Sequence, residues 1–308
     1  YDKLGHQGLL RHLMVRQSFA TKELMVALFA TEPLTFAGKS ARSASGAHES
    51  LRADLAHTSN ETLAHVAHLS HQTILPHVVD DLVHRLRERC PSLASLLWIV
   101  NRGVADKTEV EQMTCLFGRE YIEDELSGFR YRLKPQTFFQ VNPLQAERLV
   151  EIALEQGKPR ADERMIDLFC GVGTFSLPFS KRSRELVGIE IVEASVMAAR
   201  QNAAENGVDN AQFVTADARW GLDQVLSERQ GVDLLLLDPP RSGAGGKVMR
   251  KIGRARPKRV VYVSCNPATL AEDCAELLAF GYELVEVRPV DMFPHTAHVE
   301  CCVLLTKK

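Results

Sequence analysis

The sequence predicts an α/β protein: a doubly wound, mostly parallel, seven-stranded Rossmann-like sheet with an antiparallel last strand, and a smaller N-terminal α+β domain before it. Three observations predict this fold class. After residues 157–159 (Gly-Lys-Pro), strand patterns alternate strictly with helical patterns, as in a parallel sheet covered on both faces. The connection over about residues 288–298 is too short for a crossover helix, so the last two strands should run antiparallel. The N-terminal part lacks the alternation and opens with a hairpin pattern.

The N-terminal part begins with two alternating apolar segments within residues 9–30, separated by a polar turn, which predicts a β-hairpin. Residues 35–71, rich in Ala, Ser and His, predict a loop and a poorly specified helix. His65, His68 and His71 recur at helical spacing. Since no carboxylate or cysteine completes a metal site, we expect a solvated polar stripe there.

The next segments lead into the alternating region. Apolar residues at intervals of three and four over 78–89 predict an amphipathic helix that ends at Cys90-Pro91. Residues 95–101 predict a strand. Residues 119–142 predict strands separated by Ser127-Gly128, and a helix begins within 145–153.

The alternating region supplies the main sheet. Its strands are expected at residues 165–168, 186–189, 212–214, 234–237, 260–263, 283–287 and 299–305. The predicted domains are 1–130, the β-rich N-terminal α+β domain, and 131–308, the sheet domain.

The composition is that of a soluble globular protein: 308 residues, 45% hydrophobic and 25% charged. A net charge of −2 does not indicate nucleic-acid binding, but basic clusters at 181–184 and 250–259 are candidates for phosphate contacts. No apolar run spans a bilayer and no signal peptide is found. Seven irregularly spaced cysteines predict free thiols in a reducing compartment, the cytoplasm or an organelle. The cysteine spacing matches neither a zinc site nor an iron–sulfur cluster. We expect the protein to be a monomer.

Cys265 is the candidate nucleophile. It follows the β-branched strand at 260–263 and precedes a helix for which Asn266 is a good N-cap and Pro267 the first residue. The helix N-terminus should favour a thiolate, the nucleophilic form. A buried structural cysteine remains the alternative for this stretch taken alone.

A cofactor site is predicted where the first strand of the sheet ends. Gly171 and Gly173 allow the backbone to turn tightly and approach a ligand at the start of a helix. Glu190 ends the second strand, 23 residues after Asp167, the distance at which an acid reaches ribose hydroxyls. Asp217 follows the third strand, where it can accept from an adenine amine.

The fourth strand leads into Asp238-Pro239-Pro240-Arg241, which adds another acid. A dinucleotide-binding loop would carry a third glycine where Ser176 stands. Because acids surround the site, the ligand predicted is a positively charged nucleoside without phosphates, and S-adenosylmethionine is the natural candidate. Acids acting as caps at strand ends would explain each carboxylate singly but not the series.

Five blocks in this order resemble one family, the RNA uridine-C5 methyltransferases, which use S-adenosylmethionine to make 5-methyluridine in tRNA and rRNA. The resemblance is strong from about residue 132 to residue 308 and weaker before it. The blocks are Phe138 to Asn142, Asp167 to Gly173, Asp238 to Arg241, Ser264 to Leu270 and Asp291 to Thr296. The family's N-terminal RNA-binding barrel and the four-cysteine cluster of some members are not visible in these residues.

The resemblance implies roles for eight residues. Cys265 corresponds to the nucleophile and Glu300 to the general base, and residues 131–308 to the catalytic domain. The positions that contact the cofactor are Gln140, Phe169, Thr174, Glu190, Asp217 and Asp238; Asn or Ser is common where Thr174 stands. No metal is implied.

The chemistry explains these residue types. Uracil C5 is a poor nucleophile, so a thiolate first adds to C6 and C5 then takes the methyl group. A base such as Glu300 must afterwards remove the C5 hydrogen. A uridine within folded RNA must be everted into the pocket. The resemblance implies that the partner is tRNA or rRNA, and no membrane partner is expected.

Several other functions are compatible with parts of the sequence. Cys265 with His295 suggests a cysteine hydrolase, but no oxyanion motif is evident. His295, His298 and Glu300 suggest a metal site, but they lack the helical spacing of zinc hydrolases, and the histidines are expected to order the loop before Glu300. A cytosine-C5 nucleic-acid methyltransferase and an RNA-binding protein on a methyltransferase fold are the remaining alternatives.

Overall fold

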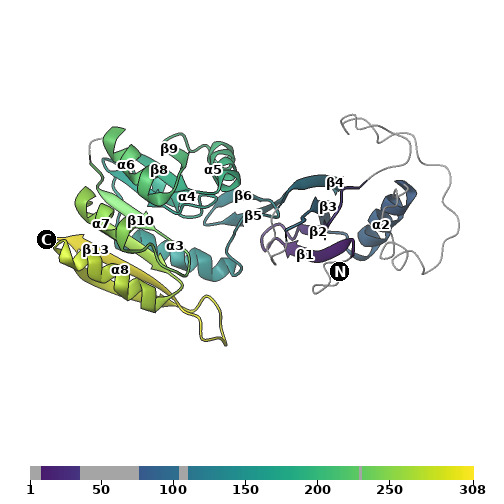
Figure 1. Cartoon of the computed structure of the whole chain (residues 1–308). Coiled ribbons are helices and arrows are strands. Elements are labelled where there is room, and N and C mark those ends of the chain that lie inside the picture. The colour runs from purple at the N-terminus through teal and green to yellow at the C-terminus, as the bar shows by residue number, and fades with distance from the viewer. Residues whose placement is uncertain (1–7, 35–75, 104–109, 229–230) are drawn as a thin grey trace. The chain divides into compact units, whose positions relative to one another are not determined.

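The computed structural model describes residues 8–34, 76–103, 110–228 and 231–308 (Figure 1). Contacts divide the chain into two compact units: residues up to 122 together with 134–136, and residues 123–133 together with 137–308. The predicted boundary between residues 130 and 131 falls within the hairpin β5–β6 (Ile122–Leu126 and Phe129–Leu133). The predicted loop, helix and histidine stripe of residues 35–71 lie outside the described residues.

The first unit contains a four-stranded sheet in the order β1-β2-β3-β4. The predicted hairpin is confirmed: β1 (Leu10–Gln17) pairs antiparallel with β2 (Leu24–Ala30). The predicted amphipathic helix is α2 (Pro76–Arg89), which packs on β3 (Leu93–Val100) and β4 (Gln112–Gly118). Sequence reasoning did not identify β4, whose side chains alternate poorly between buried and exposed.

The predicted seven-stranded sheet is confirmed in the second unit, in the order β12-β13-β11-β10-β7-β8-β9. Its strands are β7 (Arg164–Leu168), β8 (Glu185–Glu190), β9 (Ala211–Thr215), β10 (Leu234–Leu237), β11 (Arg259–Ser264), β12 (Tyr282–Val290) and β13 (Glu300–Lys307). The last strand, β13, runs antiparallel to its predecessor β12, as predicted, and also to β11 on its other side. Residues 234–237 and 260–263 are fully buried because helices cover both faces of the sheet.

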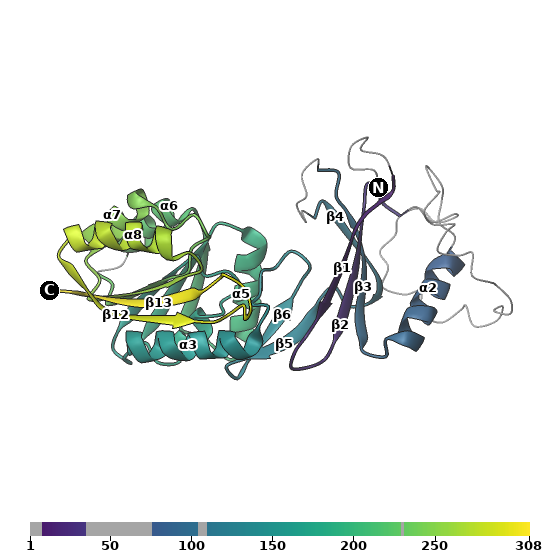
Figure 2. The same cartoon turned by 90° about the horizontal axis from the view of Figure 1, so that it is seen from below.

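Helices α6, α7 and α8 cover one face of this sheet and α3 lies on the other (Figure 2). The helices are α3 (Pro143–Gly157), α4 (Ser176–Ser180), α5 (Glu193–Glu205), α6 (Ala218–Glu228), α7 (Gly246–Ala255) and α8 (Pro267–Ala279). Asn142 caps α3 by accepting from the Gln145 N–H at 3.4 Å. Residues 137–142 form no strand, contrary to expectation; Asn142 at their end caps α3 and also donates to the Met292 carbonyl at 3.1 Å. None of the described helices combines the length and apolar character that a bilayer crossing requires.

The hairpin β5–β6 is fastened to α5 by two amide side chains. Asn202 accepts from the Arg132 N–H at 2.9 Å and Asn206 accepts from the Arg130 N–H at 2.9 Å. The other end of the fully buried Asn202 amide donates to the Val172 carbonyl in the glycine loop at 3.1 Å. One side chain therefore satisfies backbone groups of the hairpin and of the predicted cofactor loop together.

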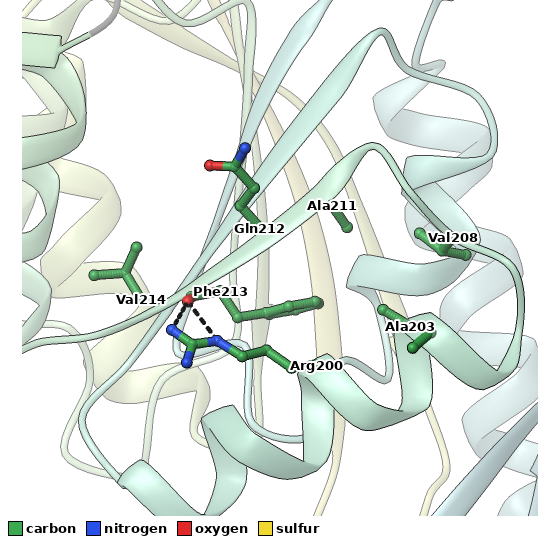
Figure 3. Close-up of a pocket in the computed structure, with 8 residues that line it drawn as sticks. Arg200, Ala203, Val208, Ala211, Gln212, Phe213 and Val214 are labelled. Atoms are coloured by element: carbon green, nitrogen blue, oxygen red, sulfur yellow. Dashed lines mark hydrogen bonds between the residues drawn. The ribbon is translucent and has the colours of Figure 1, made fainter.

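The outer edge of the sheet, strand β9, is blocked by an arginine. Arg200 of α5 donates from Nε and a terminal nitrogen to the Phe213 carbonyl, at 3.1 and 2.6 Å (Figure 3). A cavity of about 500 Å³ lies beside this contact and is lined mainly by small or apolar side chains of α5 and β9. Since none of the predicted site residues lines it, we assign the contact to edge protection.

Acidic and basic side chains are matched where the parallel strands begin. Glu163, only 2% exposed, forms ion pairs with Arg259 and with Arg160. Along the same edge the pairs are Arg164 with Glu185 at 2.6 Å, and Lys258 with Asp233 at 2.8 Å. The amino ends of these strands are therefore electrostatically balanced within the fold.

Candidate active site

The predicted site residues follow strands that end at a common edge. Strands β7, β8, β9, β10 and β11 are mutually parallel, so their carboxyl ends meet there. Antiparallel β13 begins at this edge. The topology thus brings together the segments after Leu168, Glu190, Leu237 and Ser264 with the start of β13.

Strand register places Cys265 beside Glu300. Ser264, the last residue of β11, pairs with Cys301 of antiparallel β13, so the next position outward sets Cys265 against Glu300. Glu300 is 7% exposed, and its charge acts on the Cys265 thiol. The two residues for which we predict a nucleophile and a base therefore lie together.

The predicted helix after Cys265 is confirmed. It begins at Pro267, and the Asn266 side chain accepts from the Ala268 N–H at 3.2 Å. The prediction that this terminus favours a thiolate is wrong for this structure. Burial raises the pKa of the Cys265 thiol, and the charges of Glu300 and Asp238 raise it further, because both carboxylates come from other elements of the fold.

The carboxyl groups at this edge hold their protons more tightly than usual. Burial raises the pKa of Asp238 well above its ordinary value, and the neighbouring charges of Glu300 and Asp167 add to the effect. Burial also raises the pKa of Glu300, while Arg241 lowers it. Perturbed carboxyl groups gathered at one sheet edge are typical of a functional site.

The loop after β7 has an unusual backbone. Phe169, Gly171 and Gly173 all have positive φ, at 65°, 53° and 90°. This conformation is strained for Phe169, and such strain is found at ligand sites. A Cβ on Gly171 would project into open space, so the backbone faces a free volume at this point.

Asp167 is a site residue that sequence reasoning did not select. It is 2% exposed; its Oδ2 accepts from the Ser176 hydroxyl at 2.5 Å, and its Oδ1 has no hydrogen-bond partner among the described residues. Burial raises the pKa of Asp167 to about 7; the Ser176 hydrogen bond opposes the shift and Glu190 adds to it. The signal was an acid within the apolar run of β7.

Two predicted cofactor residues at the next strand ends differ in their partners. The Glu190 carboxylate accepts from the Gly171 N–H at 3.3 Å and the Val192 N–H at 2.8 Å, which joins the ends of β7 and β8. Asp217 accepts from the Arg219 Nε at 2.9 Å, and this bond lowers the pKa of Asp217. Asp217 and Phe169 line one cavity of about 310 Å³.

The remaining predicted cofactor residues, Gln140 and Thr174, differ in their contacts, and Tyr131 forms a hydrogen bond only with the second of them. The Tyr131 ring packs on Phe139, with centroids 5.2 Å apart, and its hydroxyl donates to the Thr174 carbonyl at 3.4 Å. The half-buried Gln140 side chain makes no hydrogen bond to the residues that the structure describes. Phe139 is thus a core residue, and Phe138 is 71% exposed.

All seven cysteines are free thiols, as predicted. Within the described ranges, no group of three or more His, Cys, Asp or Glu side chains is arranged to hold a metal ion. The His298 ring packs edge-on against Phe293, with centroids 6.2 Å apart, in the loop before Glu300.

Comparison with known sequences identifies the family. A profile described as tRNA (Uracil-5-)-methyltransferase matches residues 59–308. The chain belongs to this family. The resemblance seen in the sequence is thereby confirmed.

The relatives that match this family member are longer proteins than the chain itself. An uncharacterized RNA methyltransferase of Clostridium tetani is 31% identical over 306 residues, which cover 99% of this chain and 58% of the relative. Another, from Thermosynechococcus vestitus, is 46% identical over 207 residues, 67% of this chain and 44% of the relative. The chain thus spans less than three-fifths of the length of these relatives.

A solved structure in the family confirms the α/β methyltransferase fold. The Pyrococcus abyssi tRNA (uracil-54, C5)-methyltransferase in complex with S-adenosyl-L-homocysteine aligns with a TM-score of 0.68 and 28% identity, covering 97% of this chain and 60% of that one. S-adenosyl-L-homocysteine is the demethylated form of the predicted cofactor. S-adenosylmethionine is thereby confirmed as the cofactor at the level of the family.

The site of this family member suits a cationic nucleoside. An unpartnered buried oxygen on Asp167, carboxyl groups with raised pKa values and the free volume before Gly171 all lie at one edge of the sheet. A sulfonium with an attached amino group would offset the crowded negative charge, whereas a phosphate would add to it. The residues present therefore fit S-adenosylmethionine.

Proposed function

We propose that this chain is the catalytic part of an S-adenosylmethionine-dependent RNA (uracil-C5)-methyltransferase that modifies a uridine of tRNA or rRNA. The observation that carries the proposal is the pairing of β11 with β13, which sets Cys265 beside Glu300 at the edge where the glycine loop opens. Family membership supports the same reaction class.

S-adenosylmethionine would supply an electrophilic methyl group on a positively charged sulfur. In the proposal, carboxylates offset that charge and the glycine loop admits the nucleoside. The residues assigned to holding it are Gln140, Phe169, Thr174, Glu190, Asp217 and Asp238. Asp167, with its free Oδ1, joins them as an acceptor for a bound amino group or water.

Cys265 acts first in the proposed reaction. Its thiolate sulfur forms a bond to uracil C6, and the C5–C6 π electrons shift so that negative charge develops on O4. C5 then carries the electron density needed to take the methyl group. Burial and the charge of Glu300 raise the pKa of the Cys265 thiol, so in the proposed reaction the thiol first loses its proton to water.

Glu300 acts last. It removes the proton from methylated C5, the electron pair re-forms the C5–C6 bond, and the bond from C6 to the Cys265 sulfur breaks to release thiolate. Burial raises the pKa of Glu300, which makes it a stronger base than an exposed carboxylate. The cycle closes when the proton held by Glu300 passes to the Cys265 thiolate, so the proton that Cys265 lost before the addition is the one released for each methyl group transferred.

The test is methyl transfer from labelled S-adenosylmethionine to tRNA and rRNA transcripts, with the product nucleoside identified. Cys265→Ala should abolish both transfer and the covalent RNA adduct, while Glu300→Gln should accumulate methylated RNA attached to the protein. Cys115→Ala, which removes an exposed thiol in β4, is the matched control and should behave as wild type.

Three outcomes would contradict the proposal. Turnover by Cys265→Ala would exclude the covalent mechanism, and normal product release by Glu300→Gln would exclude the assigned base. Recovery of 5-methylcytosine in place of 5-methyluridine would assign the chain to the cytosine-C5 class.

The nature of the transcript that is methylated decides between tRNA and rRNA. The similar Pyrococcus abyssi protein acts, by its description, on tRNA uracil-54, which makes a tRNA transcript the first substrate to test. The proposed place of action is a reducing compartment, the cytoplasm or an organelle, a proposal that the seven free thiols support.

A further inference from the structure

One face of α8 holds the loop that follows Asp238. Asn266 and Thr269 donate to the Arg241 carbonyl, at 2.9 and 3.3 Å. One turn further along the same face, buried Asp273 accepts from the Ala244 N–H at 2.7 Å. The backbone of this loop is therefore fixed to the helix that begins two residues after Cys265.

Asp273 is held in place from the sheet side as well. Its carboxylate accepts from the Tyr262 hydroxyl at 2.7 Å and from the Gly245 N–H at 3.1 Å. Gly243 has φ of 79°, and a Cβ there would lie 2.8 Å from the Asp273 carboxylate. The loop and the carboxylate fit each other so closely that the position of Arg241 is set by the core of the fold.

The Arg241 side chain extends toward the other half of the site. A terminal guanidinium nitrogen lies 3.4 Å from Nδ1 of His298, two residues before Glu300. The residue thus has its carbonyl bound beside the nucleophile and its guanidinium beside the segment that carries the base. The side chain is exposed to solvent.

The charge of Arg241 acts on both reacting groups. Cys265 is faced by Glu300 from β13 and by Asp238 and Arg241 from the loop after β10, and His298 contacts Arg241 from the loop before β13. Among the residues that the structure describes, Arg241 is the one cation that lowers the pKa of both Cys265 and Glu300. It opposes the burial and like charge that raise both values.

We propose that Arg241 is the positioning residue that holds positive charge near both Cys265 and Glu300, so that the thiolate can form next to a carboxylate. The inference rests on the proposed function and deepens it. When the sulfur bonds to C6 its negative charge passes to the uracil ring, and the guanidinium remains to hold Glu300 ionised as the base.

The test is the pH dependence of Cys265 alkylation by iodoacetamide, followed by mass spectrometry of the peptide that contains Cys265. Arg241→Met should lower the alkylation rate at pH 7.5 by about three- to tenfold and move its midpoint to higher pH. Arg241→Lys, which keeps the charge, should restore most of the rate. The Arg241 carbonyl that binds Asn266 and Thr269 is present in each variant.

Arg250→Met is the matched control, because Arg250 forms an exposed ion pair with Glu276 on the helical face of the domain. Its alkylation profile should coincide with wild type. A profile for Arg241→Met that also coincides with wild type would overturn the inference, as would equal losses in the Met and Lys variants. This failure is distinct from failure of the proposed function, which is decided by methyl transfer in Cys265→Ala.

Discussion

The two ends of the parallel strands in the second unit treat charge in opposite ways. Where the strands begin, Glu163, Asp233 and Glu185 each have a basic partner. Where they end, Asp167, Asp238 and Glu300 are crowded together, and burial raises all three pKa values. The same sheet therefore has balanced charges at the amino ends of its parallel strands and a cluster of acidic groups at their carboxyl ends.

This difference separates residues that stabilise the fold from residues available for function. An ion pair at the amino ends of the strands is complete within the chain. Unpaired buried carboxylates are costly for folding, so they persist where a ligand compensates them. The carboxyl ends are therefore where a cation is expected to bind.

The largest expected effect is a loss of methyl transfer when an acid at one end of strand β10 is replaced but not when an acid at the other end is replaced. Asp238→Asn, at the carboxyl end of β10, should reduce methyl transfer by about a thousandfold, because it removes a charge at the site. It should also increase the free energy of unfolding at pH 8, since a buried carboxylate among like charges disappears. Steady-state kinetics and urea denaturation measure the two effects.

Asp233→Asn, at the amino end of the same strand, is the control for that variant. Asp233 pairs with Lys258 and accepts from the Arg164 N–H at 3.0 Å. Its replacement should cost at most about 1 kcal/mol of stability and leave turnover unchanged. Equal losses of turnover in both variants would show that the two ends do not differ in function.

A smaller effect is expected at the amino ends of the strands. Glu163→Gln should lower the free energy of unfolding by about 3 kcal/mol, because Arg259 is left without its buried partner. Turnover per folded molecule should be unchanged, because Glu163 lies at the opposite edge from Cys265. Urea denaturation gives the first quantity and an active-site titration the second; loss of turnover with unchanged stability would contradict this assignment.

A further effect is a pH dependence of stability. Folded Asp167, with a pKa of about 7, keeps a proton that the unfolded chain loses near pH 4. The free energy of unfolding should therefore fall as pH rises from about 4 to 7, by at most about 1.4 kcal/mol per pH unit from this group. Asp167→Asn should flatten that slope in urea denaturation series, and an unchanged slope would mean that Asp167 ionises normally.

Most of the fold could be predicted because the central strands of the main sheet contain unbroken apolar runs, at residues 234–237 and 260–263, between loops. The antiparallel last strand followed from the length of one connection. Strand β4 was missed because its residues are only partly buried, so no period of two marks it.

The site was less accessible to sequence reasoning, because its electrostatics come from segments that are distant in sequence. The start of α8 beside Cys265 is local and was predicted. Glu300 joins it only through strand pairing, and its charge reverses the expected effect on the thiol pKa. Asp167 and Arg241 belong to recognised blocks, but their contacts depend on the folded arrangement.

The amide of Asn202 couples parts of the chain that have separate tasks. The chain passes between the two compact units at residues 122–123, 133–134 and 136–137, close in sequence to the β5–β6 hairpin. Asn202 is hydrogen-bonded both to that hairpin and to the glycine loop. The conformations of the glycine loop and of the hairpin therefore depend on one buried side chain.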